Sequence, residues 1–329
     1  MTARRIAMAL AVMLPLAVPA RPAAAQQEVP RAHAYLRAGR ISRAEAMYFL
    51  AARRRPRDPE ARFALGEYLA SRGASRVGAV LIEEARRFGG DSARAAALLA
   101  PIYARLEDFA ALTRLAHARL APGELARARW LQSNGPTIGG PDSVTLPLIP
   151  TATSSAFGAI RFIVAGDTVR AEIDPSASGL VLDQSHARSP GIRVFDAPGA
   201  ARQPAVVTRA LLGPFTLRNA PVTLVDLGGA GRAKVGLDWI ARWAPTIDPG
   251  YTRTITLRRS GRVPRKVAAP MATRVPLLLS IPGSTGVPIP GPWIAVPGGL
   301  ARLGAAEVAP MRTGRVTLDS RRGELLIDR

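Results

Sequence analysis

The stretch Ala171–Leu182 reads Ala-Glu-Ile-Asp-Pro-Ser-Ala-Ser-Gly-Leu-Val-Leu and combines strand, turn and strand signals. Polar and apolar residues alternate up to Ile173, a pattern typical of a half-buried strand. Pro175 and Gly179 then interrupt the pattern, and an apolar run follows. The stretch therefore predicts a strand that ends at Asp174, a short turn, and a second, apolar strand.

The residues around this stretch predict an all-β domain over 151–260. Short runs of β-branched and aliphatic residues are separated by turn residues; they lie at 160–164, 169–173, 179–182, 205–207, 215–217 and 221–225. The sequence Ala-Gly-Asp-Thr at 165–168 predicts a tight hairpin between the first two runs. Strands this dense, without helical segments between them, indicate a closed barrel or a sandwich.

A second informative segment, Lys-Val-Gly-Leu-Asp-Trp-Ile at 234–240, leads into an expected short helix and then a hairpin over 245–257. We expect Asp238 to be structural and to cap this helix. In this order, the first hairpin, the acid turn, the strand-rich region and the 234–240 segment resemble the retropepsin-like aspartic proteases of bacteria. The resemblance covers about residues 155–258 and implies an acid-protease-like barrel.

The acid turn of that family reads Asp-Thr-Gly-Ala-Ser, and this chain departs from it at two positions. Asp174, Ala177 and Ser178 match, whereas Pro175 replaces the threonine and Ser176 the glycine. The family threonine hydrogen-bonds across the pair of turns, and the glycine allows close backbone approach. Proline has neither a hydroxyl nor an N–H, and serine adds a side chain where space is tight.

The resemblance also implies a mechanism, in which two aspartates share one proton. A single lobe supplies one acid, so Asp174 would be the catalytic residue of an aspartic-type endopeptidase (a hydrolase) only in a homodimer. Two functions stay open. The first is this peptidase; the second is a non-catalytic envelope scaffold with a pseudo-protease barrel. In both, the expected partner is a peptide or protein.

The segment 26–131 is alanine-rich and has helical spacing of its apolar residues. A step of 34 residues brings Tyr35, Leu69 and Tyr103 into register, and the run Ala-Leu-Gly-Glu-Tyr-Leu at 64–69 is the best local match to the tetratricopeptide repeat. This resemblance implies three helical hairpins with a concave face for a peptide or a partner. A generic helical bundle with accidental register is the alternative.

Two further segments complete the expected organisation. Residues 132–150 are rich in Gly, Pro, Ser and Thr and predict a linker that enters a strand. Residues 261–329 begin rich in proline and glycine and end strand-like, and 315–327 resembles 246–257 because both predict hairpins turned by Asp and Gly. This tail has no acid turn and is too short for a full second lobe, so we expect a β-rich extension packed on the barrel.

The first 25 residues have the three parts of a secretory signal peptide: a basic start at Arg4 and Arg5, an apolar stretch, and Ala23-Ala24-Ala25 before Gln26. The apolar stretch is shorter than the ~20 residues that a membrane span needs. We therefore expect export to the periplasm or the extracellular space, without an integral membrane segment in the mature chain.

Composition argues against several other classes of protein. The chain has no cysteine, which excludes disulfides and thiolate chemistry. Its formal charge of +21 comes almost entirely from scattered arginines, with two lysines, Lys234 and Lys266, and this favours a compositional bias over nucleic-acid binding. His33, His117 and His186 lack the spacing of metal ligands. Gly228–Gly231 lacks the Lys-Ser/Thr of a phosphate-binding loop, so neither a cofactor nor a metal is predicted.

Overall fold

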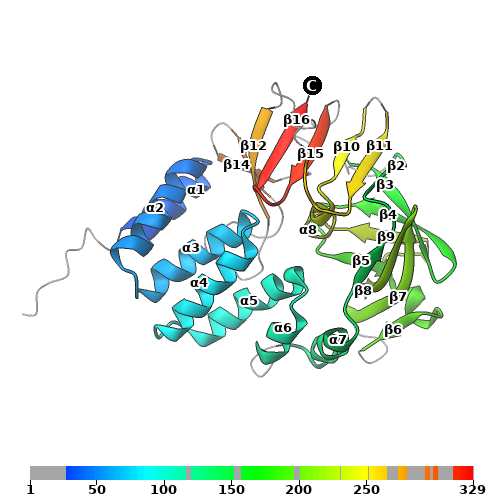
Figure 1. Ribbon diagram of the computed structural model, residues 1–329, viewed down its shortest axis with the longest axis horizontal. Coiled ribbons are helices and arrows are strands. Elements are labelled where there is room, and N and C mark those ends of the chain that lie inside the picture. Colours follow the sequence, from blue (N-terminus) through cyan, green and yellow to red (C-terminus); the bar gives the residue numbers. More distant parts are fainter. Residues whose placement is uncertain are drawn as a thin grey trace, which may run out of the picture.

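The computed structural model describes residues 27–115, 120–151, 157–195, 201–229, 231–250, 252–264, 273–279, 293–296, 299–302 and 314–328. Helices come first and strands follow, which confirms the expected α+β architecture (Figure 1). The signal peptide predicted over 1–25 lies outside the described residues. Within the described residues, no helix has both the length and the apolar character that a bilayer span requires.

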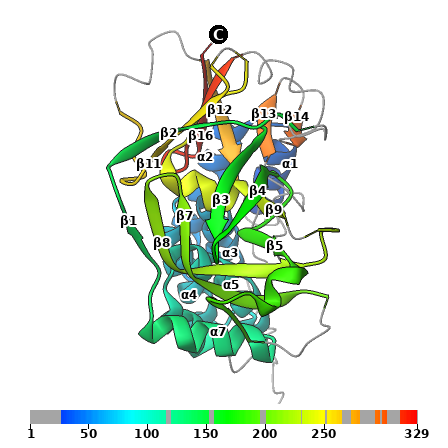
Figure 2. The ribbon, with the colours of Figure 1, turned by 90° about the vertical axis from the view of Figure 1, so that its right-hand side faces the viewer.

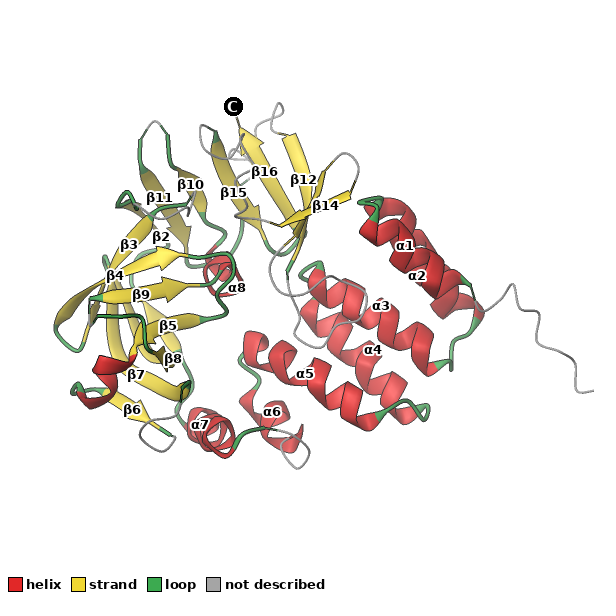
Figure 3. Ribbon diagram, turned by 180° about the vertical axis from the view of Figure 1, so that it is seen from behind, coloured by secondary structure: helices red, strands yellow, loops and turns green. Residues whose placement is uncertain are grey.

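The helical part packs as consecutive pairs, α1 on α2, α3 on α4 and α5 on α6, with α7 against the strands (Figures 1 and 3). Its helices are α1 (Glu28–Arg37), α2 (Ile41–Arg54), α3 (Pro59–Ser71), α4 (Ser75–Arg87), α5 (Ser92–Leu106), α6 (Phe109–Leu115) and α7 (Pro122–Ser133). Asp58 and Asp91 start α3 and α5 by accepting hydrogen bonds from backbone N–H groups of the first turn. Gly66 and Gly78 bring α3 and α4 so close that a Cβ on Gly78 would lie 2.6 Å from the Gly66 carbonyl oxygen.

The first sheet closes into a barrel in the order β8-β5-β9-β4-β3-β7 and back to β8, with β1 and β6 at its margins. Its strands are β1 (Thr137–Gly139), β3 (Ala159–Val164), β4 (Asp167–Ile173), β5 (Leu180–Asp183), β6 (Ile192–Val194), β7 (Gln203–Leu212), β8 (Phe215–Val225) and β9 (Arg232–Val235). The predicted hairpin joins β3 to β4, and both Ala165 and Gly166 have positive φ there, as a tight turn between twisted strands requires. Figure 2 views the barrel strands from the side opposite the helices.

The second sheet has the order β14-β13-β12-β16-β15-β10-β11-β2. Its strands are β2 (Ser143–Pro147), β10 (Thr246–Asp248), β11 (Thr254–Arg258), β12 (Thr273–Leu278), β13 (Trp293–Val296), β14 (Gly299–Arg302), β15 (Arg315–Asp319) and β16 (Glu324–Asp328). Strands of the expected linker, barrel and extension therefore share one sheet, and the helix α8 (Leu237–Ile240) with the 3-10 turn Ala241–Trp243 leads into it.

The two halves of this second sheet match each other in register about a local two-fold axis between β10 and β15. Thr246 pairs with Thr317 across the axis, and their hydroxyls are hydrogen-bonded at 2.9 Å. Within each half, Ile247 pairs with Ile255 as Leu318 pairs with Leu325. The outer strands follow the same rule, so that β2-β11-β10 corresponds to β12-β16-β15.

The turns of the two halves also correspond. The backbone N–H of Leu148 bonds the carbonyl of Arg253 at 2.8 Å, and that of Leu277 bonds the carbonyl of Gly323 at 2.7 Å. Arg253 and Gly323 both have positive φ. A single apolar core joins the barrel to this sheet, because fully buried residues such as Phe162, Trp243, Ile255 and Leu325 belong to one cluster. Barrel and extension are thus packed as one β unit.

Candidate functional site

Asp174 lies at the end of β4, where the sequence places it, next to strand β9. Its backbone N–H bonds the carbonyl of Val235 at 3.0 Å, which continues the parallel pairing of Glu172 with Lys234. Successive side chains of a strand point to opposite faces, so Asp174 shares its face with Glu172 and therefore with Lys234. The fold thus brings one of the chain's two lysines to the predicted catalytic acid.

Both oxygens of the Asp174 carboxylate are engaged. Oδ2 accepts a hydrogen bond from Nζ of Lys234 at 2.9 Å, which is also an ion pair. Oδ1 accepts from the backbone N–H of Ser176 at 2.8 Å and from its Oγ at 2.6 Å. The serine that stands in place of the family glycine therefore folds back onto the acid. Pro175 is buried beneath this small turn.

The electrostatics of the turn favour the charged carboxylate. Burial alone would raise the pKa of Asp174, but the hydrogen bonds from Ser176 and Lys234 and the lysine's charge outweigh it and hold this pKa below its usual value. Among the described residues, the hydrogen-bond partners of this carboxylate are Ser176 and Lys234, and neither is an acid. The turn thus holds a stable carboxylate anion.

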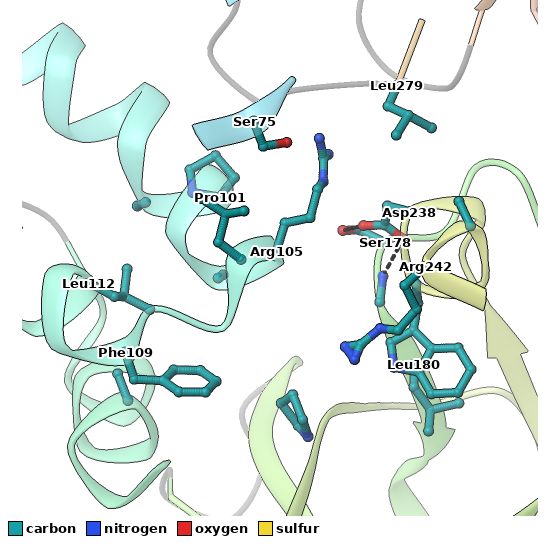
Figure 4. A pocket seen from close by; sticks show the side chains of 18 of the residues that line it. Ser75, Pro101, Arg105, Phe109, Leu112, Ser178, Leu180, Asp238, Arg242 and Leu279 are labelled. Carbon is teal, nitrogen blue, oxygen red and sulfur yellow. Dashed lines mark hydrogen bonds between the residues drawn. The ribbon is translucent and has the colours of Figure 1, made fainter. Parts of the chain in front are cut away.

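Asp238 is structural, but it does not cap the helix as expected. The N-cap position of α8 is Gly236, without a side-chain cap. Asp238 instead accepts hydrogen bonds from Ser178 Oγ at 2.7 Å and from the Gly179 N–H at 2.9 Å (Figure 4). Its role is to fasten the end of the acid turn to the start of α8. The capping prediction was wrong because Asp238 lies within α8, beyond the N-cap position, and its carboxylate accepts hydrogen bonds from the acid turn.

A cavity of about 860 Å³ opens beside the acid turn, between the helices and the barrel (Figure 4). Ser178, Gly179 and Asp238 belong to its barrel wall, and Pro101, Arg105 and Phe109 to its helical wall. No local pattern predicted this cavity, because its walls come from segments that are far apart in the sequence and meet only in the folded chain.

The histidines and the glycine-rich loop, for which the sequence predicted no metal or cofactor, have other surroundings. The His33 ring lies tilted against that of Tyr48 in the helical part, His186 is buried in the barrel, and His117 lies outside the described residues. The described residues include no group of His, Asp and Glu side chains able to hold a metal ion. The glycine-rich loop is fastened by Asp183, whose Oδ2 accepts from the N–H groups of Leu227 and Gly229 at 2.8 and 3.2 Å.

Lys234 is the functional side chain that sequence reasoning missed. A usable signal existed, because nearly all other basic residues of the chain are arginine. Its meaning depended on the register between β4 and β9, which the sequence does not specify.

Comparison with known proteins places few constraints on this site. No protein-family model matches the chain, no curated protein matches it, and the tetratricopeptide assignment is not confirmed. Among solved structures, the chain is similar to a retropepsin-like aspartic protease from Rickettsia conorii, with 13% identity and a TM-score of 0.26 over 37% of this chain and 91% of that one. A retropepsin-like aspartic protease is thus a weak structural neighbour of this chain.

Proposed function

We propose that this protein is a non-catalytic, peptide- or protein-binding module built from helical hairpins and a pseudo-protease barrel. The observation that carries the proposal is the ion pair between Asp174 and Lys234 at 2.9 Å. It supports a role for Asp174 in holding the acid turn in place rather than in cutting a peptide bond.

The aspartic mechanism requires two carboxyl groups that share one proton, so that one is charged and the other neutral. A lysine bound to Asp174 favours the charged form and takes the place of the second acid. The Ser176 hydroxyl and N–H occupy the other oxygen. A carboxylate held in this way lacks the proton that one acid must donate, and three hydrogen bonds already engage its oxygens.

The local two-fold axis of the second sheet supports the same conclusion. The position across the axis from β10 is filled by the chain's own β15, so a second copy cannot pair with β10 there. The same register makes the β13–β14 hairpin the counterpart of β3–β4, because Leu278 pairs with Trp293 as Ile149 bridges to Ala159.

This correspondence extends along the sequence to the position of the acid. In the first half, Ala159 pairs with Glu172, and Asp174 follows two residues later. In the second half, Trp293 pairs with Arg302, and the residue two positions later in the sequence is Gly304. Gly304 lies outside the described residues, but its identity alone denies the second half an acid at this position. Counted along the sequence, the residue at the spacing that places Asp174 after β4 is thus a glycine, which has no carboxyl group.

The predicted endopeptidase and its homodimer are the competing function, and hydrolysis separates the two. The purified mature chain, the Asp174→Asn variant and the Lys234→Met variant are incubated with a mixture of quenched fluorescent peptides from mildly acid to neutral pH. We expect no cleavage above that of the Asp174→Asn variant. Cleavage by the wild type that disappears in Asp174→Asn, while thermal unfolding of that variant stays cooperative, would overturn the proposal.

The compartment is a separate proposal. The composition of residues 1–25 supports export with cleavage before Gln26. Intact mass measurement of the protein purified from the cell envelope tests it, and retention of residues 1–25 would contradict it.

A further inference from the structure

The cavity beside the acid turn has the size and composition of a ligand site. Its volume of about 860 Å³ falls within the roughly 300–1,000 Å³ of typical ligand pockets. Figure 4 shows Pro101, Phe109 and Leu112 on the helical side and Leu180 on the barrel side, with Leu279 at another edge. Two walls from different halves of the molecule thus offer apolar surface to one ligand.

The charges on these walls are strongly unequal. Two carboxylates, Glu124 and Asp238, face six arginines: Arg76, Arg105, Arg127, Arg202, Arg242 and Arg321. Glu124 pairs with Arg127, and Glu107 from just outside the cavity pairs with Arg242. Asp238 is engaged with Ser178 and Gly179. The net charge of the cavity walls is therefore positive. Three of the arginines, Arg76, Arg202 and Arg321, are exposed.

Arg105 is one of the arginines that line the cavity. Its side chain extends from α5 into the space between the two walls (Figure 4). Burial lowers the pKa of its guanidinium, and the charge of Asp238 opposes this effect only in part. The guanidinium places a positive charge at the cavity surface, where the carboxylate of a ligand can meet it.

We propose that this cavity binds an acidic peptide segment, with carboxylates at Arg105 and at the rim arginines and apolar side chains against the accessible Val77, Pro101 and Leu120. Arginine binds carboxylates through two parallel hydrogen bonds, which adds direction to the charge attraction. A peptide fits better than a single acyl chain, because arginines lie among the apolar residues of the walls and three of them are exposed at the rim. The inference rests on the proposed binding function and names its ligand.

The binding test uses fluorescence anisotropy with two labelled peptides of equal length, Leu-Glu-Leu-Glu-Leu with a free C-terminus and Leu-Gln-Leu-Gln-Leu with an amidated one. We expect the acidic peptide to bind at least about tenfold more tightly, since each charge-assisted hydrogen bond can contribute about that factor. Its affinity should fall as salt is added, because the rim charges are exposed.

Variants connect the binding to the cavity. Arg105→Met should lower the affinity for the acidic peptide by about tenfold. Arg202→Met, an exchange at the exposed rim, should weaken it by a smaller factor and serves as the test if Arg105→Met does not fold. The matched control is Arg209→Met, because Arg209 is exposed on β7 outside the cavity walls, and it should leave the affinity unchanged.

Three results would overturn the inference. They are equal binding of the two peptides, unchanged affinity in both cavity variants, and binding of dodecanoate in place of the acidic peptide. The hydrolysis assay is read separately. A peptide that is bound and then cut through Asp174 contradicts the proposed function but not the cavity, whereas a peptide that is neither bound nor cut contradicts the cavity alone.

Discussion

The two halves of the second sheet have the same frame but enclose different amounts of chain. Strands β2, β11 and β10 bracket residues 148–245, which form the barrel and the acid turn. Strands β12, β16 and β15 bracket residues 279–314, whose described part is one hairpin. The cross-strand pairing of the frame is the same in both halves, although the enclosed segments differ in length. The frame alone is therefore poor evidence of a site in either half.

The largest effect should come from equivalent core truncations in the two halves. Ile255 and Leu325 correspond in register and are both fully buried in the same cluster. We expect Ile255→Ala and Leu325→Ala each to lower the free energy of unfolding by about 2–5 kcal/mol in urea titrations, with one cooperative transition. A separate early transition in Leu325→Ala that leaves the barrel signal intact would show that the short half is an independent appendage.

The next effect concerns a carboxylate in the barrel, which lies in the half that encloses more chain. Burial alone would raise the pKa of Asp183, but bonds from Ser185, Leu227 and Gly229 lower it to about 2. A carboxyl group whose pKa is lower in the folded state stabilises the fold at pH values above its usual, unfolded-state pKa. This stabilisation is lost as the pH falls through the pKa of the folded state. We therefore expect Asp183→Asn to cost about 2 kcal/mol near neutral pH, by denaturant unfolding.

The difference between wild type and Asp183→Asn should shrink between about pH 4 and 2. The exposed Asp226, which accepts one bond from Gly228, is the matched control, and Asp226→Asn should change little. A pH-independent difference would assign the effect of Asp183 to packing instead of to its charge.

A smaller effect tests the axis itself. The Thr246–Thr317 hydroxyl bond is buried, and Thr246 also accepts from Arg258 Nη1 at 2.9 Å. We expect Thr317→Val to cost about 1 kcal/mol and Thr246→Val about 1.5 kcal/mol, since only the latter removes an acceptor from a buried guanidinium. The exposed pair Thr145–Thr256 has the same 2.9 Å bond, so Thr145→Val is the control and should cost much less.

Local patterns predicted much of the β unit. The alternation up to Ile173, the Ala165-Gly166 turn and the apolar run after Gly179 all correspond to observed strands and turns. The likeness between 246–257 and 315–327 was also visible in the sequence. Its meaning as a two-fold frame was not, because that depends on the pairing of β10 with β15 across about seventy residues.

The site was harder to predict for the same reason. Asp174 and the changes at Pro175 and Ser176 are local features and were identified. The contact between Lys234 and Asp174 is set by the register of two strands. The bond between Ser178 and Asp238 and the cavity wall around Arg105 are set by the packing of distant segments on one another. Propensity and spacing carry no information on contacts of this kind.

The most direct test of the central claim is a carbon-13 NMR titration of the Asp174 carboxyl in the wild type and in Lys234→Met. The pair is partly exposed, with 41% of the Lys234 side chain accessible, so the variant should lose less than about 1 kcal/mol of stability and stay folded. We predict a wild-type pKa for Asp174 below its usual value, and a higher one in Lys234→Met. A wild-type pKa above the usual value, or one that the variant leaves unchanged, would contradict the claim that Lys234 takes the place of a second acid.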